Sequence, residues 1–234
     1  MVIQVVTLFP EMMVQVFENS ILKRAQDKGL VELRAIALRD FGVGPHRTTD
    51  DYPFGGGVGM LLRPDVVVPA VEWAAMHHAV PPKIIATSAQ GTRFTQDLAN
   101  QWAQLDHLII VAGHYEGLDQ RAITVLGAQE VSIGDFVVTG GELPAMIMVD
   151  AVVRLLPGVL GAESAALDDS FSHGAEGLLE GPQYTRPATY RCLAVPPVLL
   201  SGDHQKILEY KRQMRVTTTR ERRPDLLNNQ PNKF

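Results

Sequence analysis

Two short apolar runs in the middle of the chain each end in a turn rich in glycine. Residues 107–112 are followed by the sequence GHYEG at 113–117, and residues 130–133 are followed by GDFVVTGGELP at 134–144. Because glycine has no Cβ, bare backbone at such a turn can approach a ligand closely. Two such strand ends side by side form a pocket at the carboxyl edge of a sheet, where open α/β proteins bind ligands. The sequence therefore predicts a pocket built largely from backbone.

Acidic residues that could move a proton lie further along the chain. Between Leu155 and Thr185 there are five acids and no Lys or Arg. Asp169 stands near Phe171 in this stretch, and apolar surroundings without a cation favour a carboxylate that works as a general base. A solvated linker acid or a helix N-cap is the other interpretation of Asp169. The nearest upstream cation is Arg154, whose guanidinium could hold an oxyanion or a phosphate, or pair with a linker acid.

The chain has none of the usual signatures of nucleophilic or zinc hydrolases. It lacks a Gly-x-Ser-x-Gly elbow, a His-Glu-x-x-His pair, and Cys and His at metal-ligand spacing. His77 and His78 are adjacent, so on a helix they face different directions, and we interpret them as surface residues. Cys192 is the single cysteine, which excludes an intramolecular disulfide and favours the reducing cytoplasm.

Residues 39–63 form an irregular stretch rich in glycine and proline. Long loops in compact domains are usually functional or disordered. Gly59 is followed by Met60, where a phosphate-binding loop needs lysine, and no strand directly precedes the glycines as a dinucleotide fingerprint requires. A flexible surface loop and a loop that grips the substrate are equal alternatives here.

Apolar periodicity indicates alternating strands and helices over the first two thirds of the chain. Strands are expected at 1–8, 31–38, 83–88, 107–112 and 130–133, and helices from Pro10 to Gly29, at 64–79 with a bend or break at Pro69, from Thr95 to Gln104, and from Glu142 to about Leu156. Strands separated by helices are typical of a parallel sheet with helices on both faces. Periodicity alone predicts an ordinary doubly wound topology, because chains rarely thread loops.

Charge is distributed unevenly along the chain. The formal net charge is −5, but residues 203–223 carry seven Lys or Arg against three acids. A basic helical segment on an acidic protein suits contact with phosphate, although most such runs are solvated helix faces. No apolar run reaches the roughly 18 residues of a membrane span. The first residues are typical of a strand and not of a signal peptide.

Taken together, the motifs resemble the bacterial tRNA (guanine-N1)-methyltransferases, a family of the knotted SPOUT methyltransferase superfamily. The resemblance is carried by LFPEM at 8–12, RDF at 39–41, HRT at 46–48, GGG at 55–57, GM at 59–60, YEG at 115–117, SIGD at 132–135, GGELPAM at 140–146, PGVLG at 157–161, DSF at 169–171, YTRP at 184–187 and PPVL at 196–199. It extends from the first residues to about Leu227. The GGELPA and PPVL segments are specific at this spacing.

The resemblance implies an α/β fold with two domains. Residues 1–160 would form the cofactor-binding methyltransferase domain, a parallel-sheet SPOUT domain with a C-terminal trefoil knot. Residues 161–175 would be a flexible interdomain linker, and residues 176–234 a small, mostly helical tRNA-binding domain. The knot rests on the resemblance alone. The resemblance also implies a cytoplasmic homodimer without membrane contact, in which Asp169 of one chain serves the pocket of the other.

The implied reaction transfers a methyl group from S-adenosylmethionine to N1 of the guanine at tRNA position 37, next to the anticodon. N1 of neutral guanine carries a proton and is not nucleophilic until a base removes it. Asp169 matches the family's base, and Arg154 matches its partner, which stabilises the negative charge that moves toward O6. Magnesium is a further expectation from the family, and the sequence shows no dedicated set of ligands for it.

Site residues are carried over position by position. The cofactor pocket would consist of Ala86, Thr87, Ser88, Ala89, Gln90, Gly113, Tyr115, Glu116, Gly117, Ser132, Ile133, Gly134, Asp135, Phe136, Val137, Val138, Gly140, Gly141 and Pro144. The RNA-binding residues would be His46, Arg47, Asp50 and Arg186. The chain departs from the family pattern at Val58 and Ala89, each replacing a proline, at Phe136, replacing a tyrosine, and at Gln183, replacing a histidine. Gln183 can donate a hydrogen bond but cannot titrate, which argues against proton transfer there.

Two other functions remain as alternatives: a SPOUT enzyme that methylates ribose or another base, and a non-catalytic RNA-binding relative. The presence of Asp169, Arg154 and the pocket glycines argues against the second. The glycine, serine and acid content around Asp169 predicts that this segment is mobile when RNA is absent.

Overall fold

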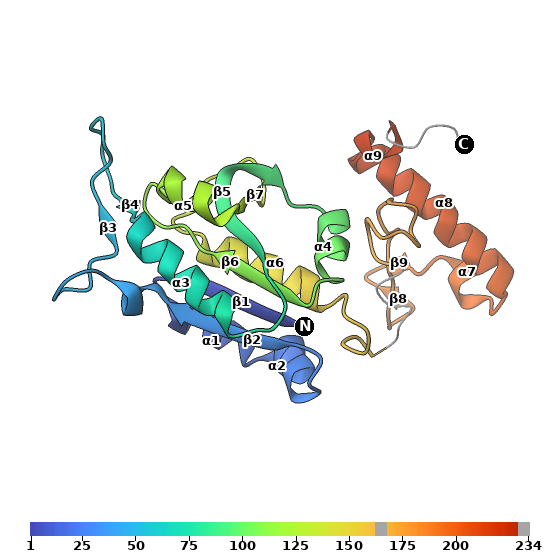
Figure 1. Cartoon of the computed structure of the whole chain (residues 1–234). Helices are drawn as coiled ribbons and strands as arrows, with labels where there is room; N and C mark the ends of the chain where they lie inside the picture. Colours follow the sequence, from blue (N-terminus) through green and yellow to red (C-terminus); the bar gives the residue numbers. More distant parts are fainter. Residues whose placement is uncertain (162–167, 229–234) are drawn as a thin grey trace. The chain divides into compact units, whose positions relative to one another are not determined.

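The chain forms two compact units in the computed structural model, which describes residues 1–161 and 168–228. The units are Met1–Gly161 and Ala162–Phe234, and each has its own secondary structure (Figure 1). Residues 162–167, part of the expected linker at 161–175, lie outside the described residues. In the described ranges, no helix is both long enough and apolar enough to cross a lipid bilayer.

Strands and helices alternate along the first unit. Its strands are β1 (Val2–Thr7), β2 (Glu32–Ala37), β3 (Asp50–Asp51), β4 (Leu61–Leu62), β5 (Lys83–Arg93), β6 (His107–Val111) and β7 (Gln129–Ser132), and its helices are α1 (Pro10–Phe17), α2 (Ser20–Asp27), the 3-10 helix η1 (Leu38–Phe41), α3 (Pro64–Met76), α4 (Gln96–Trp102), α5 (Gln120–Leu126) and α6 (Glu142–Val153). Five of the strands form one sheet in the order β2-β1-β6-β5-β7, with every neighbouring pair parallel. The predicted parallel sheet is confirmed.

Side chains of the central strands alternate between two hydrophobic cores. Along β6, Leu108 and Ile110 belong to a core shared with α1, α2, α4 and α6, whereas Ile109 and Val111 belong to one shared with α3 and α5 (Figure 1). All four side chains are buried. A strand covered by helices on both faces needs no polar side, so it is a continuous apolar run in the sequence. This is why the apolar run at 107–112 predicted β6 correctly.

The order of the strands corrects one expectation about the two glycine turns. The strands that precede them, β6 and β7, are not neighbours, because β5 lies between them and pairs with both. The strands themselves are therefore not adjacent, although the two glycine turns that follow them meet at the antiparallel bridge between His114 and Gly140, as the prediction of a shared pocket requires. Buried apolar runs do not encode which strand pairs with which.

Strand β5 is longer than predicted and contains a bulge. Thr87 and Thr92 both lie opposite Val131 of β7, so residues 88–91 protrude from the ladder. Gly91 allows β5 to resume its pairing with β7 after the bulge, because a Cβ there would overlap the backbone of residues 130–131. The predicted end near Ser88 instead marks the start of the bulge.

The helix predicted between Pro10 and Gly29 is in fact two helices. The second begins at Ser20, whose φ of 51° is incompatible with an uninterrupted right-handed helix. After the break Leu22 and Ala25 are buried, whereas Ile21 is only partly buried. The three- and four-residue spacing of apolar residues continues across the break, so periodicity could not reveal it.

The other helix ends agree more closely with the predictions. Pro69 does not split α3, which remains one helix from Pro64 to Met76. The Thr95 hydroxyl accepts a hydrogen bond from the Leu98 N–H at 3.3 Å, as expected of an N-cap.

The described part of the second unit, residues 168–228, contains three helices and a small hairpin. It contains α7 (Pro197–Leu200), α8 (His204–Arg222) and α9 (Asp225–Asn228). The sequence pattern does not predict the small hairpin of β8 (Thr189–Tyr190) and β9 (Leu193–Ala194). Its two turn residues, Arg191 and Cys192, have positive φ, where two-residue hairpins normally place Asn or Gly.

A buried histidine and a buried glutamine pair near the start of β6 and β1. His107 is 1% exposed; its Nδ1 lies 2.8 Å from the Val80 carbonyl oxygen and its Nε2 lies 2.7 Å from the Gln4 side-chain oxygen. Burial lowers the pKa of His107 below its ordinary value of 6.5. A neutral ring that donates from Nδ1 needs a donor at Nε2. As placed, the buried Gln4 side-chain nitrogen has no hydrogen-bond partner among the described residues. Exchanging the oxygen and nitrogen of the Gln4 amide lets this nitrogen donate to Nε2 of His107, which satisfies both groups.

Stability should therefore fall as the pH drops below about 6.5. In the interval between the lowered pKa of folded His107 and its ordinary value, the unfolded state binds more protons than the folded state. We expect His107→Gln to lose part of this pH dependence, whereas His46→Gln, at an exposed position, keeps it. Denaturant unfolding between about pH 5 and 8 measures the effect. The same slope in wild type and His107→Gln would contradict the assignment.

Candidate functional site

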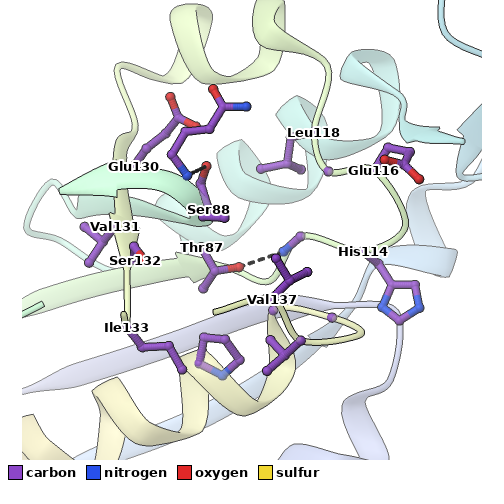
Figure 2. A pocket seen from close by; sticks show the side chains of 18 of the residues that line it. Thr87, Ser88, His114, Glu116, Leu118, Glu130, Val131, Ser132, Ile133 and Val137 are labelled. Carbon is purple, nitrogen blue, oxygen red and sulfur yellow. Dashed lines mark hydrogen bonds between the residues drawn. The ribbon is translucent and has the colours of Figure 1, made fainter. Parts of the chain in front are cut away.

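A cavity of about 340 Å³ lies beside the bulge of β5 and the carboxyl ends of β6 and β7. It is lined by Thr87, Ser88, Ala89, Gln90, Gly113, His114, Tyr115, Glu116, Gly117, Leu118, Gln120, Ile123, Glu130, Val131, Ser132, Ile133, Phe136, Val137, Val138, Thr139, Gly140, Gly141 and Pro144. Figure 2 shows Thr87, His114 and Val137, from three separate segments, around one hollow. The structure thus has a pocket at the predicted edge of the sheet.

Hydrogen bonds connect the three segments that form the cavity. The Gly113 N–H donates to the Thr87 hydroxyl at 2.9 Å (Figure 2), and that hydroxyl donates to the Val111 carbonyl at 3.3 Å. The Gly141 N–H donates to the Gly113 carbonyl at 2.6 Å. The turn after β6 is therefore fixed both to β5 just before its bulge and to the segment that precedes α6.

Two glycines leave room for this close approach of backbone to backbone. A Cβ on Gly141 would overlap the Thr87 hydroxyl and lie 2.6 Å from the Gly113 nitrogen. A Cβ on Gly140 would meet the side chains of Glu142 and His114. Only glycine fits these positions without displacement, so the cavity wall here is bare main chain.

A buried carboxylate supports this wall from behind. Glu142 is 2% exposed, and its Oε1 accepts a hydrogen bond from the Thr7 hydroxyl at 2.9 Å. Its Oε2 lies 3.4 Å from Nδ1 of His114, whose ring lines the cavity. As the first residue of α6, Glu142 also lies at the positive end of a helix dipole. The carboxylate links the ends of β1 and β6 to the start of α6.

Removing this carboxylate should destabilise the first unit. Glu142→Ala leaves the buried Thr7 hydroxyl without its acceptor, which costs about 1–3 kcal/mol. Thr7→Val removes the donor, so the double variant should lose less stability than the sum of the two single variants. Denaturant unfolding of the three variants measures the difference. Strict additivity would show that the two side chains do not interact.

Most residues expected to hold the cofactor line the cavity. The exceptions are Ala86, which is buried in β5, and Gly134 and Asp135, which lie in the segment after β7 but outside the cavity wall. Lining residues that sequence reasoning missed are His114, Leu118, Gln120, Ile123, Glu130, Val131 and Thr139. Several directly neighbour the glycine turns, which is the signal that could have identified them. Which of these residues bind a ligand stays a prediction.

The long loop between β2 and α3 contacts the cavity turn. The Glu116 N–H donates to the Met60 carbonyl at 3.0 Å, and the Leu62 N–H donates to the Gly117 carbonyl at 2.9 Å. A Cβ on Gly59 would overlap the Glu116 side chain. The loop is thus attached to the rim of the cavity, which favours the interpretation as a substrate-gripping loop over a free surface loop.

The expected RNA-binding residues of this loop lie on the surface. His46 is exposed, and Arg47 pairs with Asp40 at 3.2 Å. Asp50 accepts a hydrogen bond from the Thr49 hydroxyl at 2.9 Å. Contact of these residues with RNA stays a prediction.

The two residues expected to perform the chemistry belong to different units. Arg154 follows α6 and is half-buried, and Asp169 is half-buried in the second unit. Their proximity to each other and to the cavity stays a prediction. Arg186 is exposed and precedes a cis peptide bond to Pro187.

Comparisons with known proteins identify the family. Residues 1–229 match the family model described as tRNA (Guanine-1)-methyltransferase TrmD. The chain is 52% identical over 231 residues to a tRNA (guanine-N(1)-)-methyltransferase of Bacillus licheniformis, covering 99% of this chain and 94% of that protein. It is 51% identical to the protein of that name in Bacillus subtilis, with the same coverage, and 50% identical over 229 residues to one in Geobacillus kaustophilus, covering 98% and 92%. The chain therefore belongs to the tRNA (guanine-1)-methyltransferase family, as its motifs indicate.

Proposed function

We propose that this protein transfers a methyl group from S-adenosylmethionine to N1 of the guanine at tRNA position 37, next to the anticodon. The observation that carries the proposal is the family match over residues 1–229. The names of the similar Bacillus proteins state guanine N1 of tRNA as the target. The position within the tRNA follows from the resemblance of the motifs.

The residues around the cavity fit the cofactor. A volume of about 340 Å³ lies within the range of about 300–1,000 Å³ typical of small-molecule sites. Backbone N–H and C=O groups at 113–117 and 132–141 would bond the polar edges of an adenosine, and Ile133 and Val137 would give it apolar contacts. When bound, S-adenosylmethionine supplies a methyl group on a positively charged sulfur, which keeps the bonding electrons as the methyl leaves.

Two side chains would prepare the guanine for this transfer. Asp169 takes the proton from N1, because the neutral base has no free electron pair in the ring plane at that nitrogen. Arg154 offers guanidinium N–H donors to O6, where negative charge collects as the proton leaves. The remaining residues of the site position the two substrates and exclude water.

The proposal includes the domain scheme and a shared site. Residues 1–160 hold the cofactor, 161–175 connect, and 176–234 bind tRNA, and two chains form a dimer in which Asp169 of one serves the pocket of the other. The trefoil knot is also part of the proposal. It is supported by the antiparallel bridge between His114 and Gly140, which brings the segment after β7 back to the turn after β6.

Magnesium, implied by the resemblance, has no obvious protein site. Across residues 1–161 and 168–228, no three His, Cys, Asp or Glu side chains gather closely enough to hold a metal ion. No step is therefore assigned to a metal.

The experiment is methyl transfer to an unmodified tRNA transcript, followed by reverse transcription. Methylation at N1 blocks the base-pairing edge of guanine and stops the polymerase, whereas a ribose 2′-O-methyl group leaves that edge free. We expect a stop at position 37 and no transfer to a transcript that carries adenine there. Transfer to the ribose or to another base would contradict the proposal, as would the absence of transfer by folded protein that binds the cofactor.

A further inference from the structure

Within the second unit, Arg215 and Thr219 lie four residues apart on one face of α8, and Arg223 directly follows that helix. All three contact the segment at 168–180, which contains Asp169. Arg215 bonds Asp168, Thr219 bonds Leu179, and the Arg223 guanidinium lies 6.0 Å from the centre of the Phe171 ring. The segment at 168–180 therefore packs against this helix.

Arg215 holds the residue directly before Asp169. Its Nη2 donates to the backbone carbonyl of Asp168 and to the Asp168 carboxylate, each at 3.1 Å. The Arg215 side chain is 22% exposed, whereas that of Asp168 is 74% exposed. A guanidinium that bonds both the main chain and the side chain of one residue restrains its backbone, and a planar donor group does this better than an ammonium.

The other end of the segment is fixed by a buried hydroxyl. Thr219 is fully buried; its hydroxyl accepts from the Leu179 N–H at 3.0 Å and donates to the Arg215 carbonyl at 2.8 Å. The two ends also bond each other. The Phe171 N–H donates to the Leu178 carbonyl, and the Glu180 N–H donates to the Ser170 hydroxyl, both at 2.9 Å. Among the contacts of the described residues, those of Arg215 restrain the residue directly before Asp169.

We infer that Arg215 is a positioning residue for the general base. It restrains the backbone at Asp168 and so places the Asp169 carboxylate for proton removal. This rests on the proposed role of Asp169. An arginine on a basic helix would otherwise be assigned to an RNA phosphate, but here the guanidinium is engaged with the protein itself.

The inference predicts a defect in rate and not in binding. Arg215→Ala should lower the single-turnover rate at saturating tRNA and cofactor by about 10-fold or more, because small displacements of a catalytic group are costly. The affinity for S-adenosylmethionine should stay unchanged. Arg215→Lys, which keeps the charge and one donor, should recover part of the rate. The matched control is Glu209→Ala, at an exposed position of the same helix, which should leave the saturated rate unchanged.

The decisive comparison uses the Asp169→Ala background. If Arg215 acts through Asp169, Arg215→Ala has no further effect on the residual rate once the base is removed. An equal fold-loss in both backgrounds, or a higher Kd for tRNA with an unchanged saturated rate, would overturn the inference. Near-wild-type activity of Asp169→Ala alone would instead overturn the proposed base, so the two failures are distinguishable. Unchanged thermal midpoints across the series exclude unfolding as the cause.

Discussion

Asp169→Ala lowers the rate of methyl transfer by about 10³-fold while the protein still binds S-adenosylmethionine. Without the carboxylate, nothing in the proposed site takes the proton from N1 of guanine, and the protonated nitrogen cannot attack a methyl group. Asp169→Asn, which keeps the shape and removes the charge, should be as slow. Single-turnover assays with saturating tRNA measure the rate, and equilibrium dialysis measures cofactor binding.

The pH dependence distinguishes a lost base from a misplaced substrate. In Asp169→Ala the rate should keep rising as the pH increases, because a growing fraction of N1 loses its proton to solvent. The wild-type rate should depend less on pH over the same range. A variant that retains near-wild-type turnover at neutral pH would show that Asp169 is not the base.

Gly141→Ala should weaken cofactor binding by about 10- to 100-fold, corresponding to about 1–3 kcal/mol of overpacking. The new methyl group would overlap the Thr87 hydroxyl and crowd the Gly113 nitrogen, which belong to β5 just before its bulge and to the turn after β6. Relief requires the two turns to separate, which opens the cavity wall. Isothermal titration with S-adenosylmethionine measures the loss.

A graded series of glycine substitutions provides the control. Gly161→Ala places its methyl group in open space, with nothing within 4 Å, and should bind the cofactor as wild type does. Gly140→Ala meets the ends of the Glu142 and His114 side chains before any backbone atom, and should have an intermediate effect. Equal affinities for all three variants would mean that bare backbone at these turns is not needed.

The sequence predicted the features that depend on composition within one segment. β6 was recognisable because both of its faces are buried, which leaves a continuous apolar run such as residues 107–112. Thr95 was recognisable as a cap because its bond to Leu98 spans only three residues. The pocket edge was recognisable because two glycine turns follow strand positions. The family and its reaction came from motif resemblance, which the comparisons confirm.

Features that depend on contacts between distant segments were not predictable. Thr7 and Glu142 are 135 residues apart, and no local pattern shows that their side chains meet. The insertion of β5 between β6 and β7 is likewise a matter of pairing and not of composition. The hydrogen bond from Leu62 to Gly117 also joins segments that are distant in the sequence. The knot depends on contacts between distant segments, and the shared site depends on contacts between chains, so neither follows from local sequence patterns, and both stay proposals.

A heterodimer with one defect in each chain tests the central claim most directly. One chain carries Asp169→Ala and the other Gly141→Ala, with different affinity tags so that only the mixed dimer is purified. If the glycine-walled pocket of one chain works with the carboxylate of its partner, one of the two sites is intact, and the dimer should turn over tRNA at about half the wild-type rate. Activity no higher than that of the two parent homodimers would contradict the account.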